Sequence, residues 1–269
     1  MKKILVPTDF SENAMNALLF ARELACTLDC KLTLLHTFQA PQRSDMLISL
    51  DDVLRQDAEE EMATFLERAA LKEPPEVKIL KGDSVRTIAD FAGEGNFNLI
   101  VMGTKGASGL KEVFLGSITG GVMRHTPIPI LAIPEDYTPR PIRNIAFAIA
   151  NMELSGEEVV APLKELTRRF DAKVHIFHSV KDKEEADQSE LLKTAGWLEG
   201  LPHTFSIEEE RGSLHESIKA FVKSADADML CLVRRKHGLI GFFERLFKTS
   251  VTLGEVFHCE LPLLVLHSE

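Results

Sequence analysis

The chain has 269 residues, of which 45% are hydrophobic and 27% charged, and its formal net charge is −10. This composition is typical of globular proteins and excludes disordered, collagen-like and disulfide-framework chains. The acidic balance argues against a nucleic-acid or membrane partner, because both are negatively charged and attract basic proteins.

The start of the chain and its cysteines indicate the cellular compartment. No apolar run approaches the ~20 residues that cross a bilayer, and the run Ile4–Val6 is too short for the core of a secretory signal. We therefore expect a cytoplasmic protein. Cys26, Cys30, Cys231 and Cys259 form no CxxC pair, so we expect reduced thiols and predict no metal site.

The first half of the chain alternates short apolar runs with helical patterns. Asp9 or Ser11 can cap the first helix. The alternation predicts an α/β fold, a parallel sheet with helices on both faces. The expected strands cover residues 4–6, 32–35, 77–80, 99–102 and 130–133, and the expected helices cover 14–28, 51–72, 85–92 and 117–124.

The same pattern restarts after the proline-bracketed linker 134–141. Residues 145–149 read as a new first strand, followed by a helix over 159–170, and residues 171–179 repeat the pattern of 29–37. An internal repeat of about 130 residues explains these echoes. It predicts two domains, residues 1–136 and 142–269.

A glycine-rich segment follows the strand at 99–102 and opens the helix at Ser117. Glycine lets the backbone approach a ligand closely, and the unpaired amides of a helix start suit an anion. Neither a Walker P-loop nor a GxGxxG motif is present. On the residues alone, a phosphate cradle and a flexible connector remain equal alternatives.

The spacing Gly-x2-Gly-x9-Gly-Ser, formed by Gly103, Gly106, Gly116 and Ser117, resembles the nucleotide-binding signature of the universal stress protein family. The opening 4–9 with Ser11 and the closing 124–131 are similar to that family as well. The resemblance covers residues 1–136, and more weakly 142–269 through the repeat. It implies two tandem adenine-nucleotide-α-hydrolase-like (flavodoxin-like) domains, each an open five-stranded parallel sheet of order 3-2-1-4-5.

The resemblance also implies an ATP site (or one for AMP or ADP) at the carboxyl ends of strands one and four, where open α/β sheets bind ligands. Asp9 would face a ribose hydroxyl or the adenine amino group, and the backbone of 35–37 would read the adenine edge. The phosphates would bind near Ser117 with Mg²⁺ from solvent. The full implied set is Pro7, Thr8, Asp9, Ser11, His36, Thr37, Met102, Gly103, Lys105, Gly106, Gly116, Ser117, Ile118 and Thr119.

Several of these residues also have a simpler interpretation. Asp9 can serve only as a helix cap, Lys105 as a solvated loop charge and Met102 as a core residue. His36 and His178 recur at equivalent repeat positions, and a structural role fits them better than metal binding.

The second half departs from the family pattern. Ala148 and Ala150 stand where Pro7 and Asp9 stood, and the loop 233–241 lacks the glycine spacing. Thr249-Ser250 replaces Gly116-Ser117, so we predict no ATP site there. The apolar cluster at 242–247 would close the vacated pocket or form an interface, and the basic residues 234–236 would bind another anion or form a solvated loop.

The resulting expectation is a regulatory ATP-binding stress protein with no catalytic residue, because the sequence offers no nucleophile–base pair. Two alternatives stay open: an ATPase or nucleotidyl transferase of the same superfamily, and a nucleotide-free interaction module. The resemblance further implies an intramolecular pseudo-dimer through the last strands, 130–133 and 263–266, and allows a homodimer.

Overall fold

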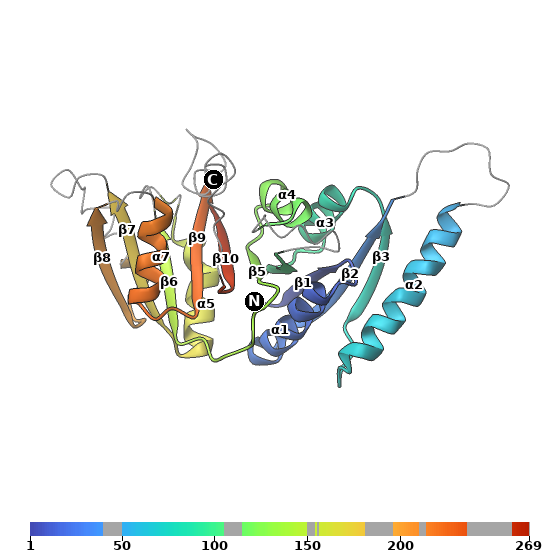
Figure 1. Cartoon of the computed structure of the whole chain (residues 1–269), viewed down its shortest axis with the longest axis horizontal. Helices are drawn as coiled ribbons and strands as arrows, with labels where there is room; N and C mark the ends of the chain where they lie inside the picture. The colour runs from blue at the N-terminus through green and yellow to red at the C-terminus, as the bar shows by residue number, and fades with distance from the viewer. Residues whose placement is uncertain are drawn as a thin grey trace. The chain divides into compact units, whose positions relative to one another are not determined.

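The computed structural model describes residues 1–39, 50–104, 115–149, 154, 156–180, 196–209, 214–235 and 260–268. The chain divides into two compact units, Met1–Tyr137 and Thr138–Glu269 (Figure 1). The division falls inside the proline-bracketed linker. No helix in the described ranges is long and apolar enough to cross a membrane.

The first unit is a parallel sheet with the strand order β3-β2-β1-β4-β5, which confirms the predicted order 3-2-1-4-5. Strands and helices alternate along the chain as the sequence predicts. The elements are β1 (Lys3–Thr8), α1 (Glu12–Leu28), β2 (Lys31–Phe38), α2 (Leu50–Ala69), β3 (Glu76–Lys81), α3 (Ser84–Glu94), β4 (Leu99–Gly103), α4 (Ser117–His125) and β5 (Ile130–Ile133).

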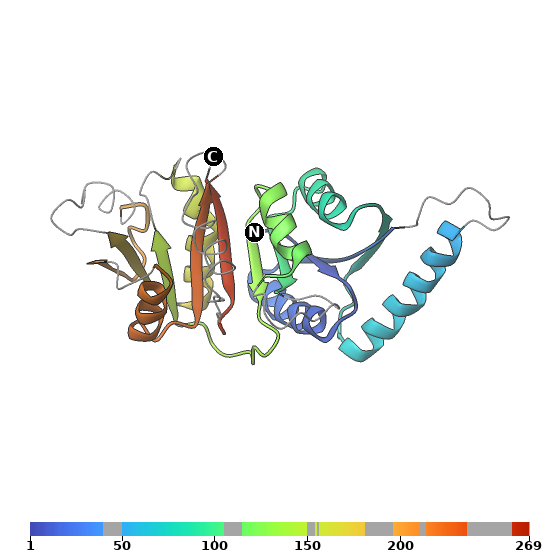
Figure 2. The same ribbon diagram turned by 45° about the horizontal axis from the view of Figure 1, so that its top comes forward.

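Helices cover both faces of this sheet. Figure 2 shows α1 and α2 on one face and α3 and α4 on the other. Right-handed crossovers require this arrangement, because the chain moves from β1 toward β3 and then returns across β1 to β4 and β5. Burial from both sides explains why 4–6, 99–102 and 130–133 are continuous apolar runs.

Helix α1 begins and ends where the sequence indicates. The Ser11 side chain accepts a hydrogen bond from the Ala14 amide at 3.2 Å, so Ser11 rather than Asp9 is the N-cap. Asp29 ends the helix in the left-handed region, with φ of 53°. The predicted apolar stripe is buried against the sheet.

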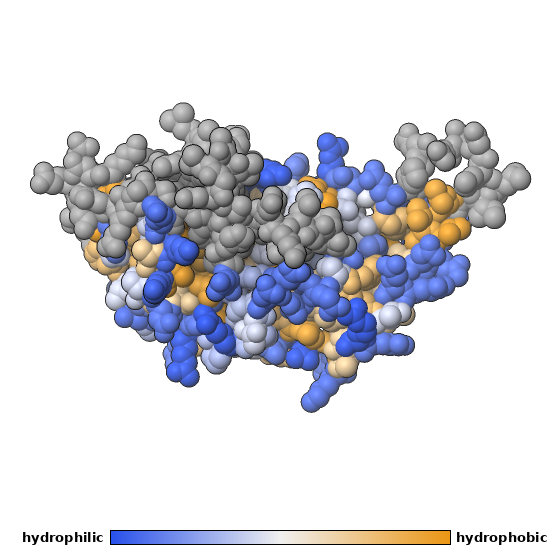
Figure 3. All heavy atoms as spheres, viewed as in Figure 1, coloured by the Kyte–Doolittle hydropathy of each residue, from blue (hydrophilic) through white to orange (hydrophobic). Residues whose placement is uncertain are grey.

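Helix α2 ends earlier than predicted, at Ala69 instead of near Lys72. Ala70 takes a positive φ of 46°, which breaks the helical path before the prolines are reached. Ala58, Met62, Phe65 and Ala69 form its buried side. The rest of α2 is largely charged, and Figure 3 shows hydrophilic side chains along much of it, with an apolar patch near its start.

The second unit repeats the topology, with the strand order β8-β7-β6-β9-β10. Helices α5 and α7 lie on opposite faces of its sheet (Figure 1). The elements are β6 (Asn144–Ile149), the 3-10 turn η1 (Glu157–Val160), α5 (Ala161–Phe170), β7 (Lys173–Val180), β8 (His203–Glu209), α7 (Leu214–Ser224), β9 (Met229–Arg235) and β10 (Leu263–Ser268).

The second unit differs from the sequence prediction in two places. Val233, Arg234 and Arg235, which the sequence assigns to the loop 233–241, belong to the strand β9. The expected helix over 159–170 is a 3-10 turn followed by α5, with Pro162 in the first turn of α5, where its missing N–H costs nothing. The segments 236–241, 242–247 and 249–250, to which the sequence assigns a loop, an apolar cluster and a lost glycine motif, lie outside the described residues. So does Ala150.

Two side-chain clamps recur in both units. The His36 Nδ1–H donates to the Thr8 carbonyl at 2.9 Å, and the His178 Nδ1–H donates to the Ile149 carbonyl at 2.9 Å. Each histidine is the register partner of the residue that it clamps. The structural role predicted for this pair therefore has a physical basis: each ring holds the end of the first strand against the second.

The second clamp joins the start of the first strand to the residue before the fourth. The Asn98 Oδ1 accepts from the amides of Lys2 and Lys3, at 2.7 and 3.1 Å. The Asp228 Oδ2 accepts from the equivalent amides of Arg143 and Asn144, at 2.8 and 3.0 Å. Within each unit, this clamp fixes the register between the first and fourth strands of the sheet.

Candidate functional site

A cavity of about 280 Å³ lies at the carboxyl ends of β1 and β4 in the first unit. Its position follows from the strand register. β1 pairs with β2 as far as Thr8, but its register with β4 covers only Ile4 and Leu5. The two strands therefore part beyond Leu5, at the point where the strand order reverses. This switch point is where open α/β sheets bind ligands.

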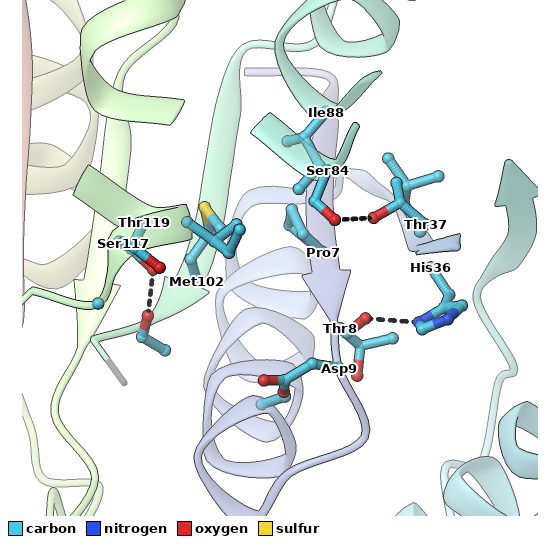
Figure 4. Close-up of a pocket in the computed structure, with 15 residues that line it drawn as sticks. Pro7, Thr8, Asp9, His36, Thr37, Ser84, Ile88, Met102, Ser117 and Thr119 are labelled. Carbon is cyan, nitrogen blue, oxygen red and sulfur yellow. Dashed lines mark hydrogen bonds between the residues drawn. The ribbon is translucent and has the colours of Figure 1, made fainter. Parts of the chain in front are cut away.

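The structure brings most of the implied site residues together around this cavity (Figure 4). Those that line it are Pro7, Thr8, Asp9, His36, Thr37, Met102, Gly103, Gly116, Ser117, Ile118 and Thr119. Ser11 caps α1 and is absent from the lining, although it contacts Asp9. Lys105 and Gly106 lie outside the described residues.

The lining also includes residues that sequence reasoning missed: Ala14, Ser84 and Ile88. Ser84 and Ile88 belong to α3, which crosses from β3 back to β4. A helix that makes this crossover must pass over the ends of β2 and β1, so the predicted strand order already contained the signal. Ala14 comes from the first turn of α1, directly after the Ser11 cap.

The wall opposite α3 is the start of α4. Gly116 is its N-cap, and no side chain in the described part of the protein caps the helix. The first intrahelical bond runs from the Gly120 amide to the Gly116 carbonyl at 2.9 Å. The amides of residues 117–119 therefore have no helical acceptor, and together with the helix dipole they favour an anion.

The Thr119 side chain has a structural role at the start of α4. Its hydroxyl donates to the Gly103 carbonyl at 2.8 Å, and the residue is 4% exposed. This bond holds the start of α4 against the end of β4 and uses the only proton of the hydroxyl. Thr119 can therefore contact an anion through its amide, whereas the exposed Ser117 retains a hydroxyl for that purpose.

Gly103 is required by packing within the protein. A Cβ built at this position would lie 2.1 Å from the side-chain amide of Asn13. That amide is 3% exposed and, in the orientation that satisfies both of its ends, bonds the Ile133 carbonyl and the Glu135 amide at 3.1 Å each. The close approach that the sequence assigned to a ligand is made here by α1.

The Asp9 carboxylate lies at the exposed mouth of the cavity. Its Oδ1 accepts from the Ser11 hydroxyl at 2.6 Å and from the Ser11 amide at 3.2 Å. Ser11 therefore fixes the carboxylate at the end of β1. An acceptor held in this way suits a hydroxyl of a ligand.

The His36 ring turns toward Thr8 and away from Ser117 and Met102 (Figure 4). It stacks on Phe10, with ring centroids 4.4 Å apart, and Phe10 contacts Phe65 of α2 edge-on. The ring thus belongs to the packing between the sheet and α2. Among the described residues, no group of three or more His, Cys, Asp or Glu side chains could hold a metal ion.

The electrostatics of the cavity come mainly from the backbone. Within its described lining, Asp9 is the one carboxylate and no lysine or arginine is present. Among the described lining residues, the source of positive potential for an anion is therefore the start of α4, on the side opposite Thr37 and Ser84 (Figure 4).

Comparison with known proteins agrees with this geometry. The pattern of the universal stress protein family matches residues 1–134. Universal stress protein YxiE of Bacillus subtilis is 30% identical over 144 residues, which are 49% of this chain and 97% of that protein. Universal stress protein MJ0531 of Methanocaldococcus jannaschii is 29% identical over 143 residues, 49% of this chain and 81% of that protein. The chain therefore belongs to the universal stress protein family.

A solved structure extends the likeness to both units. The crystal structure of a universal stress protein from Archaeoglobus fulgidus covers 99% of this chain and 96% of its own, with a TM-score of 0.71 and 20% identity. At that identity the likeness concerns the fold, and it supports a tandem arrangement of two similar α/β units.

Proposed function

We propose that the first unit binds ATP, or an adenine nucleotide with fewer phosphates, in the cavity between β1 and β4, as a regulatory ligand of a stress-response protein. One observation carries the proposal: the start of α4, which no described side chain caps, and the end of β1 open onto the same cavity. A helix start without a capping side chain is an anion site, and the crevice beside it has room for a nucleoside.

The phosphates fit the α4 side. The amides of residues 117–119 and the Ser117 hydroxyl would donate to them, and Mg²⁺ would enter bound to the phosphates themselves. Lys105 and Gly106 would join them according to the sequence motif. Because the described lining holds no cation, Mg²⁺, these amides and Lys105 would balance the charge of the phosphates.

The nucleoside fits the opposite side. Pro7, Ile88 and Met102 offer apolar surface to a base, and Asp9 would accept a hydrogen bond from a ribose hydroxyl. The volume of about 280 Å³ lies near the lower end of small-molecule sites, about 300–1,000 Å³. A nucleoside would fill the enclosed part, with the phosphates extending along the helix start.

The proposed role is regulatory because the described lining is poor in catalytic groups. Hydrolysis of a phosphoanhydride at a useful rate needs a base that orients or deprotonates the attacking water. The one carboxylate, Asp9, is held at the mouth by Ser11. We therefore expect turnover to be slow. Fast turnover that is lost in a folded Asp9→Ala variant would favour the ATPase alternative.

Calorimetric titration with Mg²⁺-ATP tests the proposal. We expect the unaltered protein to bind ATP and Gly116→Val to bind it at least about 100-fold more weakly, because the added side chain covers the helix start and several charge-assisted hydrogen bonds are lost. Gly116 has φ of −57° and ψ of 158°, which valine adopts without strain, so the variant should fold.

Gly93→Val is the matched control. Gly93 lies in α3 outside the cavity lining, and a Cβ built there meets no atom within 4 Å. Its ATP affinity should equal that of the unaltered protein. Undiminished binding in Gly116→Val would place the site elsewhere. Absence of ATP binding in the unaltered protein would instead favour the nucleotide-free module.

A further inference from the structure

Two hydroxyl groups that the sequence did not bring together lie side by side at the nucleoside end of the cavity. The Thr37 Oγ1 donates to the Ser84 Oγ at 2.8 Å, and both residues line the cavity. Figure 4 shows this pair across the cavity from Ser117 and Thr119, with Pro7 and Met102 between them. The pair therefore faces the part of a ligand that is farthest from the helix start of α4.

The backbone around the pair is fixed. The Gly82 amide donates to the Phe38 carbonyl at 2.9 Å, which ties the turn before α3 to the end of β2. The Asp83 Oδ1 then caps α3 by accepting from the Arg86 amide at 3.0 Å. Ser84 thus directly follows two anchored residues, Gly82 and Asp83. Hydroxyls held by rigid elements can recognise a ligand with little loss of entropy.

The hydrogen-bonding capacity of the pair points to a particular kind of partner. Each hydroxyl has one proton and two lone pairs, and their mutual bond uses one proton and one lone pair. One proton and several lone pairs remain. The edge of adenine that carries the exocyclic amine presents a ring-nitrogen acceptor next to an N–H donor, which matches what remains.

We propose that the Thr37–Ser84 hydroxyl pair binds the edge of the purine ring that carries the exocyclic amine. This inference rests on the proposed function, and it makes Ser84 and Thr37 specificity-determining residues through their side chains. The backbone of 35–37, to which the sequence assigns the adenine edge, would then share that task with a residue from α3.

A comparison of two ligands tests the inference. Mg²⁺-ATP and purine riboside 5′-triphosphate differ only in the exocyclic amine. The unaltered protein should bind ATP about tenfold more tightly, because the analogue without the amine leaves a polar group of the hydroxyl pair unmatched. In Ser84→Ala and in Thr37→Val the preference should fall to about twofold, mainly through weaker binding of ATP.

Ser117→Ala is the matched control at the phosphate end. It should weaken both triphosphates to the same extent and leave the preference near tenfold, because it removes a contact that the two ligands share. Thermal unfolding of each variant without ligand checks that the fold is retained. Ser84→Ala removes one oxygen at the first position of a helix that Asp83 still caps, so it should fold.

The outcomes separate the two proposals. A protein that binds both triphosphates without preference, or a Ser84→Ala variant that keeps the full preference or weakens both ligands equally, overturns the inference and leaves nucleotide binding intact. A protein that binds neither triphosphate overturns the proposed function, and this inference fails with it.

Discussion

The two units share a framework and differ at the carboxyl ends of their central strands. Both have the strand order 3-2-1-4-5, and both carry the histidine clamp and the clamp at the start of the first strand. The strand registers align the units residue by residue. In that alignment Thr8 corresponds to Ile149 and Gly103 corresponds to Val233.

The positions that differ lie at the carboxyl ends of β4 and β5 and of their counterparts β9 and β10. Where the first unit has Gly103 packed under Asn13, the second has Val233, 9% exposed. Where the first unit has Pro134 after β5, the second has His267 within β10. The residues that hold the sheet together and those that shape its carboxyl edge therefore form separate sets. One set can change while the other stays.

Replacing Gly103 by valine, the residue at the equivalent position of the second unit, should have the largest effect on stability. In Gly103→Val, the new side chain would overlap the buried Asn13 amide and the α1 backbone, the latter 3.2 Å from the Cβ alone. Overpacking of this kind costs about 3 kcal/mol, so the free energy of unfolding of the first unit should fall by that amount. ATP binding should disappear with it. Urea unfolding followed by far-UV circular dichroism measures the change.

The second unit serves as an internal reference in this experiment. The only tryptophan of the chain is Trp197, which belongs to the second unit. Its fluorescence transition should stay unchanged in Gly103→Val. If the circular dichroism transition of the variant matches that of the unaltered protein, the interpretation of Gly103 as a packing requirement is wrong.

The pH dependence of stability should differ between the units. The pKa of His267 is lowered to about 4, mainly by burial of the ring and in addition by the positive charge of Arg234. A folded-state pKa below the unfolded value of about 6.5 means that the folded unit resists protonation. The second unit should therefore be most stable above pH 6.5 and lose about 2 kcal/mol between pH 7 and pH 5 through this residue.

Trp197 fluorescence during urea unfolding at pH 7 and pH 5 measures that loss. His267→Gln removes the titrating ring and should abolish most of the difference between the two pH values. The first unit carries Pro134 at the equivalent position and lacks this contribution. A His267→Gln variant with the same pH dependence as the unaltered protein would assign the effect to other groups.

Exchanging the residues of the second clamp should have the smallest effect. Asp228→Asn keeps an acceptor for the Arg143 and Asn144 amides and loses the ion pair with Arg140, in which the Arg140 Nε lies 3.3 Å from the carboxylate. Arg140 is half exposed, so the loss should be about 0.5 kcal/mol and should shrink with added salt. A loss above about 2 kcal/mol would mean that the charge itself holds the clamp.

Asn98→Asp is the reciprocal exchange in the first unit. It keeps an acceptor for the backbone amides of Lys2 and Lys3 and gives that acceptor a negative charge. The stability of the first unit should rise by about 0.5 kcal/mol at low salt. Together the two variants separate the hydrogen bonds, which the units share, from the charge, which they do not.

Much of the fold could be predicted from the sequence because its signals are local. The run at 99–102 is buried on both faces and therefore apolar throughout, and Ser11 is a polar residue at the start of a helical stripe. The end of α2 was harder to predict. The positive φ of Ala70 has no signal in its residue type, whereas the prolines that follow suggested a later end.

The candidate site was predictable in part for a similar reason. Asp9 directly follows β1 and Gly116 directly precedes α4, so their place at the carboxyl edge follows from local order along the chain. Ser84 and Ile88 reach the cavity only through the crossover of α3. The true neighbour of Gly103 is Asn13, a residue distant in sequence, and no spacing rule joins the two.

The alternation of strands and helices, the internal repeat and the family could all be predicted from the sequence, because periodicity and motif spacing are properties of the chain. Which atoms contact one another depends on the tertiary fold. The Thr119 hydroxyl donates to the Gly103 carbonyl, the His36 ring stacks on Phe10, and the Thr37 hydroxyl donates to Ser84. Contacts between distant segments depend on strand register and helix crossover, which fix directions in space that a linear pattern does not contain.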